Sequence, residues 1–513
     1  MLPLFSVETW TLLVLFFTLF ILYGTWPYGY FKNLGIPGPR PWPFMGSLGS
    51  MIMQGFVNFD KQCHQKYGRV WGMFEGRSPM LLVTDPAIIK AVMVKECYST
   101  FTNRRKAVLN GPMADGITAV EDEKWKRIRN TLSPTFTSGR MKEIFPLVTM
   151  YADRLMEYLR KQNLKEAVNI KDFFGLYNMD VLASSSFSVE TDAINNPKDP
   201  FIENVKKVMS FSFSNPIFLI AILFPGLGRY LEKMGFSMFS KTLMDYFYTA
   251  LKKIKDKHQE EDNGHGRVDF LRLMMRSQIT DEEAAKSNEE QPVKGLTEHE
   301  ILSQSFIFIL AGYETTSVTL SSVAYNIATN PEVMQKLVEE IDSVFPNNAP
   351  ITYDKLMHLE YLDMVISESM RVWPPAPRLE RMCKQTIVID GITIPKGTLV
   401  AIPALILHQD PDIWESPDKF NPERFSKENK ESINPYAYMP FGLGPRNCIG
   451  MRYALLLMKL ILVRVLQNFT MESCKETQIP VELDGLYRPK KPVMLKFEPR
   501  STNQQINESV KAN

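Results

Sequence analysis

Cysteine is scarce in this sequence of 513 residues: there are five, an odd number, and no two of them form a C-x-x-C pair. Paired cysteines at short spacing are typical of zinc sites, and an even set at regular spacing is typical of a disulfide framework. The sequence argues against both and fits a reducing compartment. The five stand far apart, at Cys63, Cys97, Cys383, Cys448 and Cys474.

Charge of one sign and nucleotide-binding motifs are also lacking. The formal net charge is only +2, so no global field favours a nucleic-acid partner. The run from Phe441 to Gly444 lacks the G-x-G-x-x-G pattern and its strand–helix context, and no Walker A motif occurs. We therefore expect that the protein does not bind NADPH itself, and that its electrons come from a partner.

Only the N-terminus carries a long apolar run. The 23 residues between Glu8 and Lys32 are uncharged, and as a helix they would measure about 34 Å, enough to cross a ~30 Å hydrocarbon core. A cleaved signal peptide is the alternative, but no basic residue precedes the run and no small-x-small site closes it. Lys32 and Arg40 follow the run and place the rest of the chain on the cytosolic side. The aromatic residues that suit the two membrane interfaces are Trp10, Trp26 and Tyr28.

A proline-rich segment, Ile36 to Pro43, follows the apolar run. Proline fixes φ and prevents helix formation, so this segment predicts a stiff connection. The sequence thus divides into a membrane anchor (1–31), a proline-rich hinge (32–45), a main domain (46–500) and a polar C-terminal tail (501–513). We expect a single-pass protein of the endoplasmic reticulum membrane, in contact with lipid, whose main domain faces the cytosol.

The main domain predicts a mainly α-helical fold with small β-sheets. Helical periodicity dominates from about 120 to 380, whereas 80–84 and 386–403 are strand-like. Asp390-Gly391 between two apolar runs predicts a β-hairpin. The charge-dense stretch 252–300 indicates exposed helix ends and a loop.

The most informative motif surrounds Cys448. A thiolate can bind iron when its charge is stabilised, as it is near the N-terminus of the apolar helix that follows. The glycines around it allow the backbone to approach a flat cofactor. Arg446 can pair with an anionic group on that cofactor, and Phe441 can cover the sulfur. A lone cysteine is otherwise usually a small buried apolar residue.

The complete pattern F-x-x-G-x-R-x-C-x-G resembles the haem-binding loop of the cytochrome P-450 superfamily, the haem-thiolate monooxygenases. The resemblance implies the P-450 fold, haem b as cofactor, and Cys448 as the axial ligand of the haem iron. It also implies that the thiolate of Cys448 favours cleavage of O₂. Segment 36–43 likewise resembles the proline-rich hinge of microsomal members.

A second motif lies in the middle of a long helix. Thr297-Glu-His-Glu300 is a capping box, and the helical pattern continues to Asn330-Pro331, about 33 residues. Ala311 to Thr316 matches the family pattern [AG]-G-x-[DE]-T-[TS]. Because O₂ cleavage requires protons, we expect Glu314 to deliver them and Thr315 to hydrogen-bond the oxygen. The alternative is that these threonines only bond back to the preceding helical turn.

Further motifs indicate support for the fold and for the haem. Glu368 and Arg371 match E-x-x-R, and Arg424 in Pro-Glu-Arg-Phe resembles the third member of that structural network. Trp125 and Arg129 share one helical face and resemble the pair that holds a haem propionate. Other arginines that could do the same work are Arg104, Arg381 and Arg446.

Two surfaces extend these expectations. Lys124, Lys126 and Arg127 are expected to turn partly outward and meet an acidic reductase, solvated charge being the alternative. A phenylalanine-rich run within 211–240 could roof a lipophilic pocket or dip into the membrane surface, ordinary core being the alternative.

End to end, the chain resembles the vertebrate microsomal family-three, subfamily-A enzymes. That resemblance implies unspecific oxidation of bulky lipophilic drugs, other xenobiotics and steroids. The pocket residues that it suggests are Thr118, Phe213, Ala376 and Pro377.

The function that follows is insertion of one oxygen atom from O₂, with electrons from NADPH through a separate reductase and cytochrome b5 as a second candidate donor. Two alternatives remain. A haem-thiolate isomerase or dehydratase would use peroxides and have no need of Glu314 and Thr315. A non-enzymatic haem sensor or lipid carrier would suit the anchor, but not the proton relay.

Overall fold

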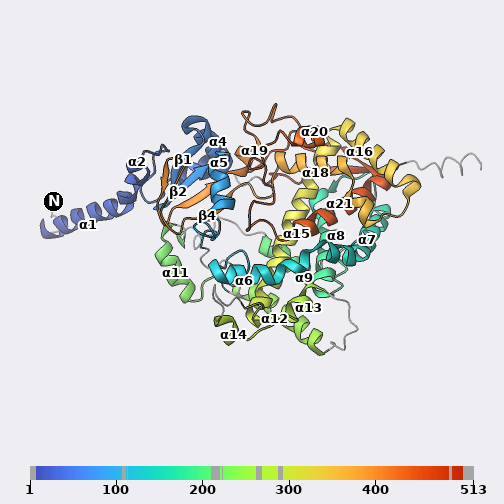
Figure 1. Ribbon diagram of the computed structural model, residues 1–513, viewed down its shortest axis with the longest axis horizontal. Coiled ribbons are helices and arrows are strands. Elements are labelled where there is room, and N and C mark those ends of the chain that lie inside the picture. Colours follow the sequence, from blue (N-terminus) through green and yellow to red (C-terminus); the bar gives the residue numbers. More distant parts are fainter. Residues whose placement is uncertain are drawn as a thin grey trace, which may run out of the picture. The chain divides into compact units, whose positions relative to one another are not determined.

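The structure, a computed structural model, describes residues 7–106, 111, 114–209, 220–221, 223–237, 239–260, 269–286, 293–484 and 488–500. The chain forms two compact units, each assembled from segments that are distant in sequence. Unit 1 comprises Met1–Gly111, Ser212–Met238 and Arg378–Ile406, and unit 2 comprises Pro112–Phe211, Phe239–Pro377 and Leu407–Asn513. Helices predominate and the sheets are small (Figure 1), as the sequence predicts.

Unit 1 is built around a sheet of four strands in the order β1-β2-β7-β4. Its strands are β1 (Val70–Glu75), β2 (Ser78–Val83), β4 (Leu379–Met382) and β7 (Leu399–Ile402). Strand β2 pairs antiparallel with β1 and parallel with β7, which pairs antiparallel with β4. The helical elements of unit 1 are α1 (Val7–Thr25), η1 (Trp26–Gly29), α2 (Tyr30–Asn33), α3 (Leu48–Gln54), α4 (Phe56–Tyr67), α5 (Pro86–Lys90), η2 (Ala91–Lys95) and α11 (Pro225–Lys233).

The predicted hairpin is present in unit 1. Strands β5 (Ile387–Ile389) and β6 (Ile392–Ile394) pair antiparallel across Asp390 and Gly391. Both turn residues have positive φ, 49° and 75°, as the tightest hairpin turns require. The sequence signal is thus confirmed.

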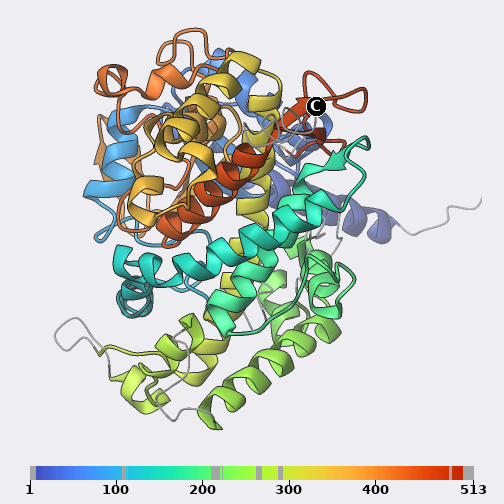
Figure 2. The ribbon, with the colours of Figure 1, turned by 90° about the vertical axis from the view of Figure 1, so that its right-hand side faces the viewer.

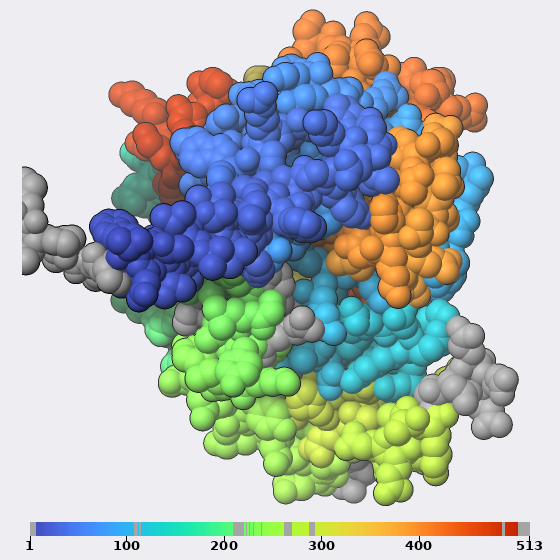
Figure 3. All heavy atoms as spheres, turned by 90° about the vertical axis from the view of Figure 1, so that its left-hand side faces the viewer, coloured from blue at the N-terminus to red at the C-terminus, as the bar shows by residue number. Residues whose placement is uncertain are grey.

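Helix α1 is exposed along its length, and only Gly24 is buried. Figure 3 shows it in dark blue on the surface of the molecule. Two helical stretches of the described chain, Val7–Asn33 and α15 (Glu298–Ala328), are long and apolar enough to cross a membrane, but α15 is mostly buried in protein. An exposed apolar helix without a protein partner along most of its surface fits a lipid environment.

The end of α1 is fastened to the rest of unit 1. The Arg77 guanidinium lies 3.6 Å from the centre of the Tyr23 ring, within cation–π range. The Phe44 ring packs directly on Gly24, where a Cβ would lie 2.6 Å from the nearest ring carbon. Any larger residue at position 24 would displace that ring.

The end of the proline-rich segment packs against η1, which directly follows α1. The Tyr28 hydroxyl donates to the Trp42 carbonyl oxygen at 2.7 Å and accepts from the Gly46 N–H at 3.1 Å. The segment predicted to be a stiff connection therefore has its far end tied to the helix that precedes it.

Unit 2 is predominantly helical. Its longer helices are α6 (Asp122–Leu132), α7 (Ser138–Arg160), α8 (Ile170–Phe187), α9 (Pro200–Met209), α12 (Lys241–Glu260), α15 (Glu298–Ala328), α16 (Pro331–Val344), α18 (Glu360–Val372) and α21 (Met451–Asn468). Shorter helical elements are η4 (Ser133–Phe136), α13 (Phe270–Met275), α14 (Asp281–Ala285), η5 (Pro346–Asn348), α17 (Tyr353–Met357), η6 (Pro422–Phe425) and α20 (Lys427–Lys430). Along the sequence, the division between the two units falls within α19 (Ala404–His408), after Ile406. A small sheet has the order β3-β9-β8, from Val168–Asn169, Met494–Pro499 and Phe469–Ser473.

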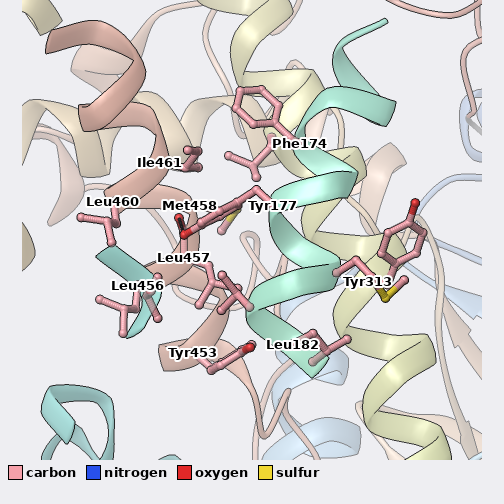
Figure 4. Close-up of a cluster of buried hydrophobic side chains, with 14 of the residues drawn as sticks. Phe174, Tyr177, Leu182, Tyr313, Tyr453, Leu456, Leu457, Met458, Leu460 and Ile461 are labelled. Carbon is pink, nitrogen blue, oxygen red and sulfur yellow. Dashed lines mark hydrogen bonds between the residues drawn. The ribbon is translucent and has the colours of Figure 1, made fainter. Parts of the chain in front are cut away.

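The core of unit 2 lies around α8 and α15, which are both largely buried because they are apolar on most sides. Figures 1 and 2 show α8 running beside α15, with α7 and α21 next to them. In Figure 4, α8 lies between α21 and α15, and Tyr177 points toward α21. The predicted capping box of Thr297 and Glu300 is confirmed and fixes the start of α15.

Candidate active site

Cys448 lies in a tight loop that leads into α21. Gly442 and Gly444 have φ of 74° and 68°, values that residues with a Cβ rarely adopt. The Cys448 N–H donates to the Phe441 carbonyl oxygen at 2.8 Å and closes the loop. Cys448 is exposed whereas Phe441 packs against the core. The loop thus presents its thiol outward from a fixed backbone, three residues before the first turn of α21.

Helix α6 supports this loop through the two residues predicted to share one face. The Arg446 guanidinium lies 4.6 Å from the centre of the Trp125 ring, and its Nη2 donates to the Val120 carbonyl oxygen. Arg129 donates to the backbone oxygen and to Oδ1 of Asn447, both at 2.9 Å. Asn447 immediately precedes Cys448, so α6 holds the thiol-bearing loop by two adjacent residues.

A buried network of charges lies in the same unit. Arg371 and Glu368 form a bidentate pair with distances of 2.7 and 2.8 Å, and neither side chain is exposed. Arg424 reaches the same carboxylate at 3.3 Å. Arg371 also donates to the carbonyl oxygens of His408 and Pro417, at 2.9 and 2.8 Å. The structure therefore brings together the three residues that the motifs single out.

His408 links this network to the start of the cysteine loop. Burial and the neighbouring charge of Arg371 lower the pKa of His408 to about 3. The ring is therefore neutral, and its Nε2 accepts a hydrogen bond from the Met439 N–H at 3.0 Å. A neutral imidazole at this place fixes the chain two residues before Phe441.

Helix α15 carries the second motif on a face that is not covered by the described protein. Ala311 and Thr315, one turn apart, are exposed in a helix whose other residues are mostly buried. The Thr315 hydroxyl donates to the Ala311 carbonyl oxygen at 2.6 Å, the back-bond considered as the alternative for this residue. The single proton of this hydroxyl is used in that bond, so the group can only accept in this rotamer. The hydroxyl would have to turn away from Ala311 to donate a proton in a relay.

Glu314, on the neighbouring face of α15, has a partner that its sequence context did not reveal. Its Oε1 lies 2.5 Å from Nζ of Lys171 at the start of α8, and both side chains are partly exposed. A carboxylate beside apolar residues requires such a partner or a proton, and Lys171 supplies the former.

Two of the predicted haem-binding arginines lie in unit 1. Arg381 on β4 is buried, and its Nε has no hydrogen-bond partner among the described residues. Burial, together with the positive charge of nearby Arg104, lowers the pKa of Arg381 to about 10. Two guanidinium groups so close together favour an anionic ligand.

The predicted pocket residues differ in their exposure. In unit 2, Thr118 is exposed and Ala376 and Pro377 are half-buried. Phe213 lies outside the described residues, as does much of the phenylalanine-rich run. The loop containing Thr118 is attached to α15 by Gln304, which accepts from the Ile117 N–H at 2.7 Å and donates to the Asp115 carbonyl oxygen at 2.6 Å.

The expectation that Arg127 turns outward is wrong. Its guanidinium forms a buried bidentate pair with Glu300 at 2.6 and 2.9 Å, because a charge on this side of α6 meets the start of α15 rather than solvent. Lys124 is partly exposed and pairs with Asp115 at 2.7 Å. These residues line a charged cavity of about 330 Å³, which includes no residue of the cysteine loop.

The ion pair between Asp115 and His299 in this cluster predicts a pH-dependent contribution to stability. Their 2.8 Å contact raises the pKa of His299 above 6.5 and lowers that of Asp115 to about 2, with Lys124 and Glu300 nearby. Because folding raises the pKa of His299, its ion pair stabilises the fold fully below pH 6.5. This contribution is lost as the pH rises through the pKa of His299 in the folded protein. In mildly acid solution, His299→Gln should lower the free energy of unfolding by roughly 1 kcal/mol or less. At a pH about two units above 6.5, the same substitution should lower it by a smaller amount. Urea denaturation at both pH values measures this, and an equal loss at both would contradict it.

The chain is similar in sequence to known proteins over most of its length. The family model described as Cytochrome P450 matches residues 36–497. "Cytochrome P450 3A27" of Oncorhynchus mykiss is 54% identical over 502 residues, covering 97% of this chain and 96% of that protein. "Cytochrome P450 3A29" of Sus scrofa is 52% identical over 503 residues, covering 98% of each. The chain belongs to the cytochrome P450 family.

Membership of the P450 family confirms the predicted resemblance and fold, and with them a haem-thiolate monooxygenase whose cofactor is haem b. The residues fit that group. Within unit 2, the thiol of Cys448 is exposed on a loop whose glycines permit close approach of a flat ring. When bound, haem would supply the activation of O₂, and P450 enzymes hold its iron through a cysteine thiolate.

Several residues around the site carry no signal in the sequence. Lys171, His408 and Asn447 contact Glu314, Met439 and Arg129 respectively, each from a distant part of the chain. Asn447 lies inside the cysteine motif, but at a position that the pattern leaves open, and Lys171 and His408 lie in none of the motifs. The one available signal was Glu314 itself, because a carboxylate in an apolar stretch requires a partner elsewhere in the chain.

Proposed function

We propose that this P450 inserts one oxygen atom from O₂ into lipophilic substrates such as steroids, drugs and other xenobiotics, with electrons that pass from NADPH through a separate reductase. The observation that carries the proposal is the exposed thiol of Cys448 on a loop held by α6 and by His408. In this proposal, Cys448 is the iron ligand, and Phe441 covers its sulfur. Trp125, Arg129, Arg104, Arg381 and Arg446 hold the cofactor directly or through the loop.

The proton path forms the second part of the proposal. Glu314 is partly exposed and paired with the partly exposed Lys171, so its carboxylate is in contact with solvent. Thr315 lies on the exposed face of α15 beside Ala311. A carboxylate that reaches solvent next to a hydroxyl can pass protons inward through water. Glu368, Arg371 and Arg424 stabilise the fold behind the loop and take no part in chemistry.

The redox partner remains a proposal that rests on charge and on the lack of a nucleotide-binding motif. Lys124 and Lys126 keep part of their surface exposed on α6, the helix that holds the cysteine loop. Both are already paired with acidic neighbours, and Arg127 is buried. An acidic reductase, or cytochrome b5 as a second donor, would compete for these two lysines.

The proposed membrane location is supported by the exposed apolar helix α1. We propose a single-pass anchor (1–31) in the endoplasmic reticulum membrane, a connecting segment (32–45), a catalytic domain (46–500) that faces the cytosol and a C-terminal tail (501–513). Lys32 and Arg40 beyond the apolar helix support this orientation. Thr118, Ala376, Pro377 and Phe213 remain the proposed substrate contacts.

Reconstitution in lipid vesicles with NADPH and a microsomal reductase tests the function. Steroid and drug products should form only when NADPH, reductase and O₂ are all present, and the reduced protein should give the carbon monoxide spectrum of a thiolate-ligated haem. Conversion of an organic hydroperoxide without reductase, and no NADPH-dependent product, would favour the isomerase or dehydratase. A pigmented protein without turnover of either kind would indicate a sensor or carrier.

Thr315→Ala should uncouple electron consumption from product formation. The variant should still oxidise NADPH, but product per NADPH should fall by at least about tenfold, since positioned proton transfer contributes roughly 10²- to 10⁴-fold, and hydrogen peroxide should accumulate. Stoichiometry of NADPH, peroxide and product measures this. Thr319→Ala is the matched control, because Thr319 makes the same kind of back-bond one turn further on and should leave coupling unchanged. Equal coupling in the wild type and in Thr315→Ala would contradict the role.

A further inference from the structure

One stripe of α8 lies against the part of α15 that carries Glu314 and Thr315. Lys171 at its start pairs with Glu314. One turn on, Gly175 leaves room for Tyr313, whose hydroxyl would be 2.9 Å from a Cβ at that position. Further along, Leu182 lies close to Gly312, where an added Cβ would be 3.0 Å from its nearest methyl carbon. Figure 4 shows Leu182 on α8 and Tyr313 on the neighbouring α15.

Between these contacts, Asn178 donates hydrogen bonds to the backbone of α15. Its Nδ2 lies 2.8 Å from the carbonyl oxygen of Tyr313, 3.0 Å from that of Gly312 and 3.2 Å from Oγ of Ser317. The amide must face this way, since Oδ1 in its place would meet backbone acceptors. Asn178 is fully buried, and its Oδ1 has no hydrogen-bond partner within the described part of the chain.

Three consecutive carbonyl groups of α15 thus accept bonds from side chains. Thr315 donates to Ala311 at 2.6 Å, Asn178 to Gly312 and Tyr313, and Ser317 also to Tyr313 at 2.7 Å. Side-chain donors of this kind loosen or bend a helix locally. Of these donors, only Asn178 comes from another helix, so among them it alone ties the backbone carbonyl groups of this stretch to α8.

We propose that Asn178 is a positioning residue for oxygen activation, which rests on the function proposed above. The Tyr313 carbonyl belongs to the peptide unit whose N–H is that of Glu314, and the Gly312 carbonyl belongs to the unit before it. Holding both oxygens fixes the orientation of the two peptide planes that lead to Glu314 and Thr315. Glycine at 312 permits these planes more freedom than another residue would, and Asn178 restricts it.

Asn178→Leu, which keeps the branched shape and the number of heavy atoms and removes both N–H donors, tests the proposal. The variant should bind haem and give the same carbon monoxide spectrum as the wild type, yet its product per NADPH should fall at least threefold and its peroxide release should rise. Hydrogen exchange, followed by mass spectrometry, should accelerate at least threefold in peptides that cover residues 311–317. The effect on coupling should not add to that of Thr315→Ala in the double variant.

Tyr177→Phe is the matched control. Tyr177 is the adjacent residue of α8, is equally buried, and donates to the Leu457 carbonyl oxygen of α21 at 3.2 Å rather than to α15. This variant should alter thermal stability without changing coupling or exchange at 311–317. Equal coupling in Asn178→Leu and wild type, or equal uncoupling in both variants, would overturn the proposal.

A second variant covers the case in which Asn178→Leu does not fold. Ser317→Ala removes the other side-chain donor to the Tyr313 carbonyl oxygen and leaves Asn178 as its sole side-chain tie among the described residues. Adding Asn178→Ser to Ser317→Ala should lower coupling further, and no further change would refute the role. Failure of the proposed function is distinguishable, because the wild type itself would then lack the carbon monoxide spectrum or NADPH-dependent product.

Discussion

Cys448→Ser should abolish monooxygenase activity and remove the carbon monoxide spectrum of a thiolate-ligated haem. A serine hydroxyl stays protonated and neutral, so it cannot replace the anionic sulfur as an iron ligand. The loss should exceed the roughly 10- to 100-fold that removal of a residue behind a metal ligand costs. Difference spectroscopy of the reduced protein and NADPH-dependent turnover with reductase measure the two effects.

The control for this substitution is Cys474→Ser. Cys474 is half-buried near β8 and contacts Thr477 and the Met494 carbonyl oxygen, interactions that a serine hydroxyl can also make. Its spectrum and turnover should match those of the wild type. A Cys448→Ser protein with an unaltered spectrum would overturn the assignment of the ligand, and with it the function.

Glu368→Gln should lower the free energy of unfolding by about 3–5 kcal/mol, the cost of leaving a buried charge without its partner. The carboxylate accepts from Arg371, Arg424 and the Asn421 N–H, and its side chain is fully buried. Removing its charge strands Arg371, which is also fully buried. Because domains are commonly stable by only about 5–15 kcal/mol, much of this variant should unfold during expression. Urea denaturation followed by circular dichroism measures the loss.

An exposed pair provides the comparison. Lys427 and Glu360 are also in contact, but both side chains are mostly exposed, so solvent screens their attraction. Lys427→Gln should therefore leave the urea midpoint unchanged. A wild-type midpoint for Glu368→Gln would show that the buried network does not support the fold.

Local features of the fold could be predicted from the sequence. The hairpin at Asp390-Gly391 and the capping box at Thr297 are fixed by residues within a few positions of one another, and both are confirmed. The division into two units could not be predicted in this way. Unit 1 joins three segments far apart along the chain, and which distant segments pack together depends on surfaces that only the folded chain presents.

The same distinction applies to the site. Glu314 and Thr315, or Glu368 and Arg371, are recognisable because their spacing is local. Lys171 lies 143 positions before its partner Glu314, so the pairing appears only when α8 and α15 pack together. For Arg127 the expectation from the sequence was wrong. This residue of α6 was expected to face solvent, but it pairs with Glu300, which lies 173 positions further along the chain.

The fastening at the end of α1 has a mechanical consequence. Arg77 in the β1–β2 turn and Phe44 in the chain before α3 contact the last turn of that helix, and Tyr28 just beyond it bonds to Trp42 and Gly46. In the membrane anchor proposed above, a bilayer thinner than the apolar length of α1 would make that helix tilt, and the contacts of Arg77 and Phe44 would pass the strain of that tilt to the β1–β2 turn and to the chain before α3.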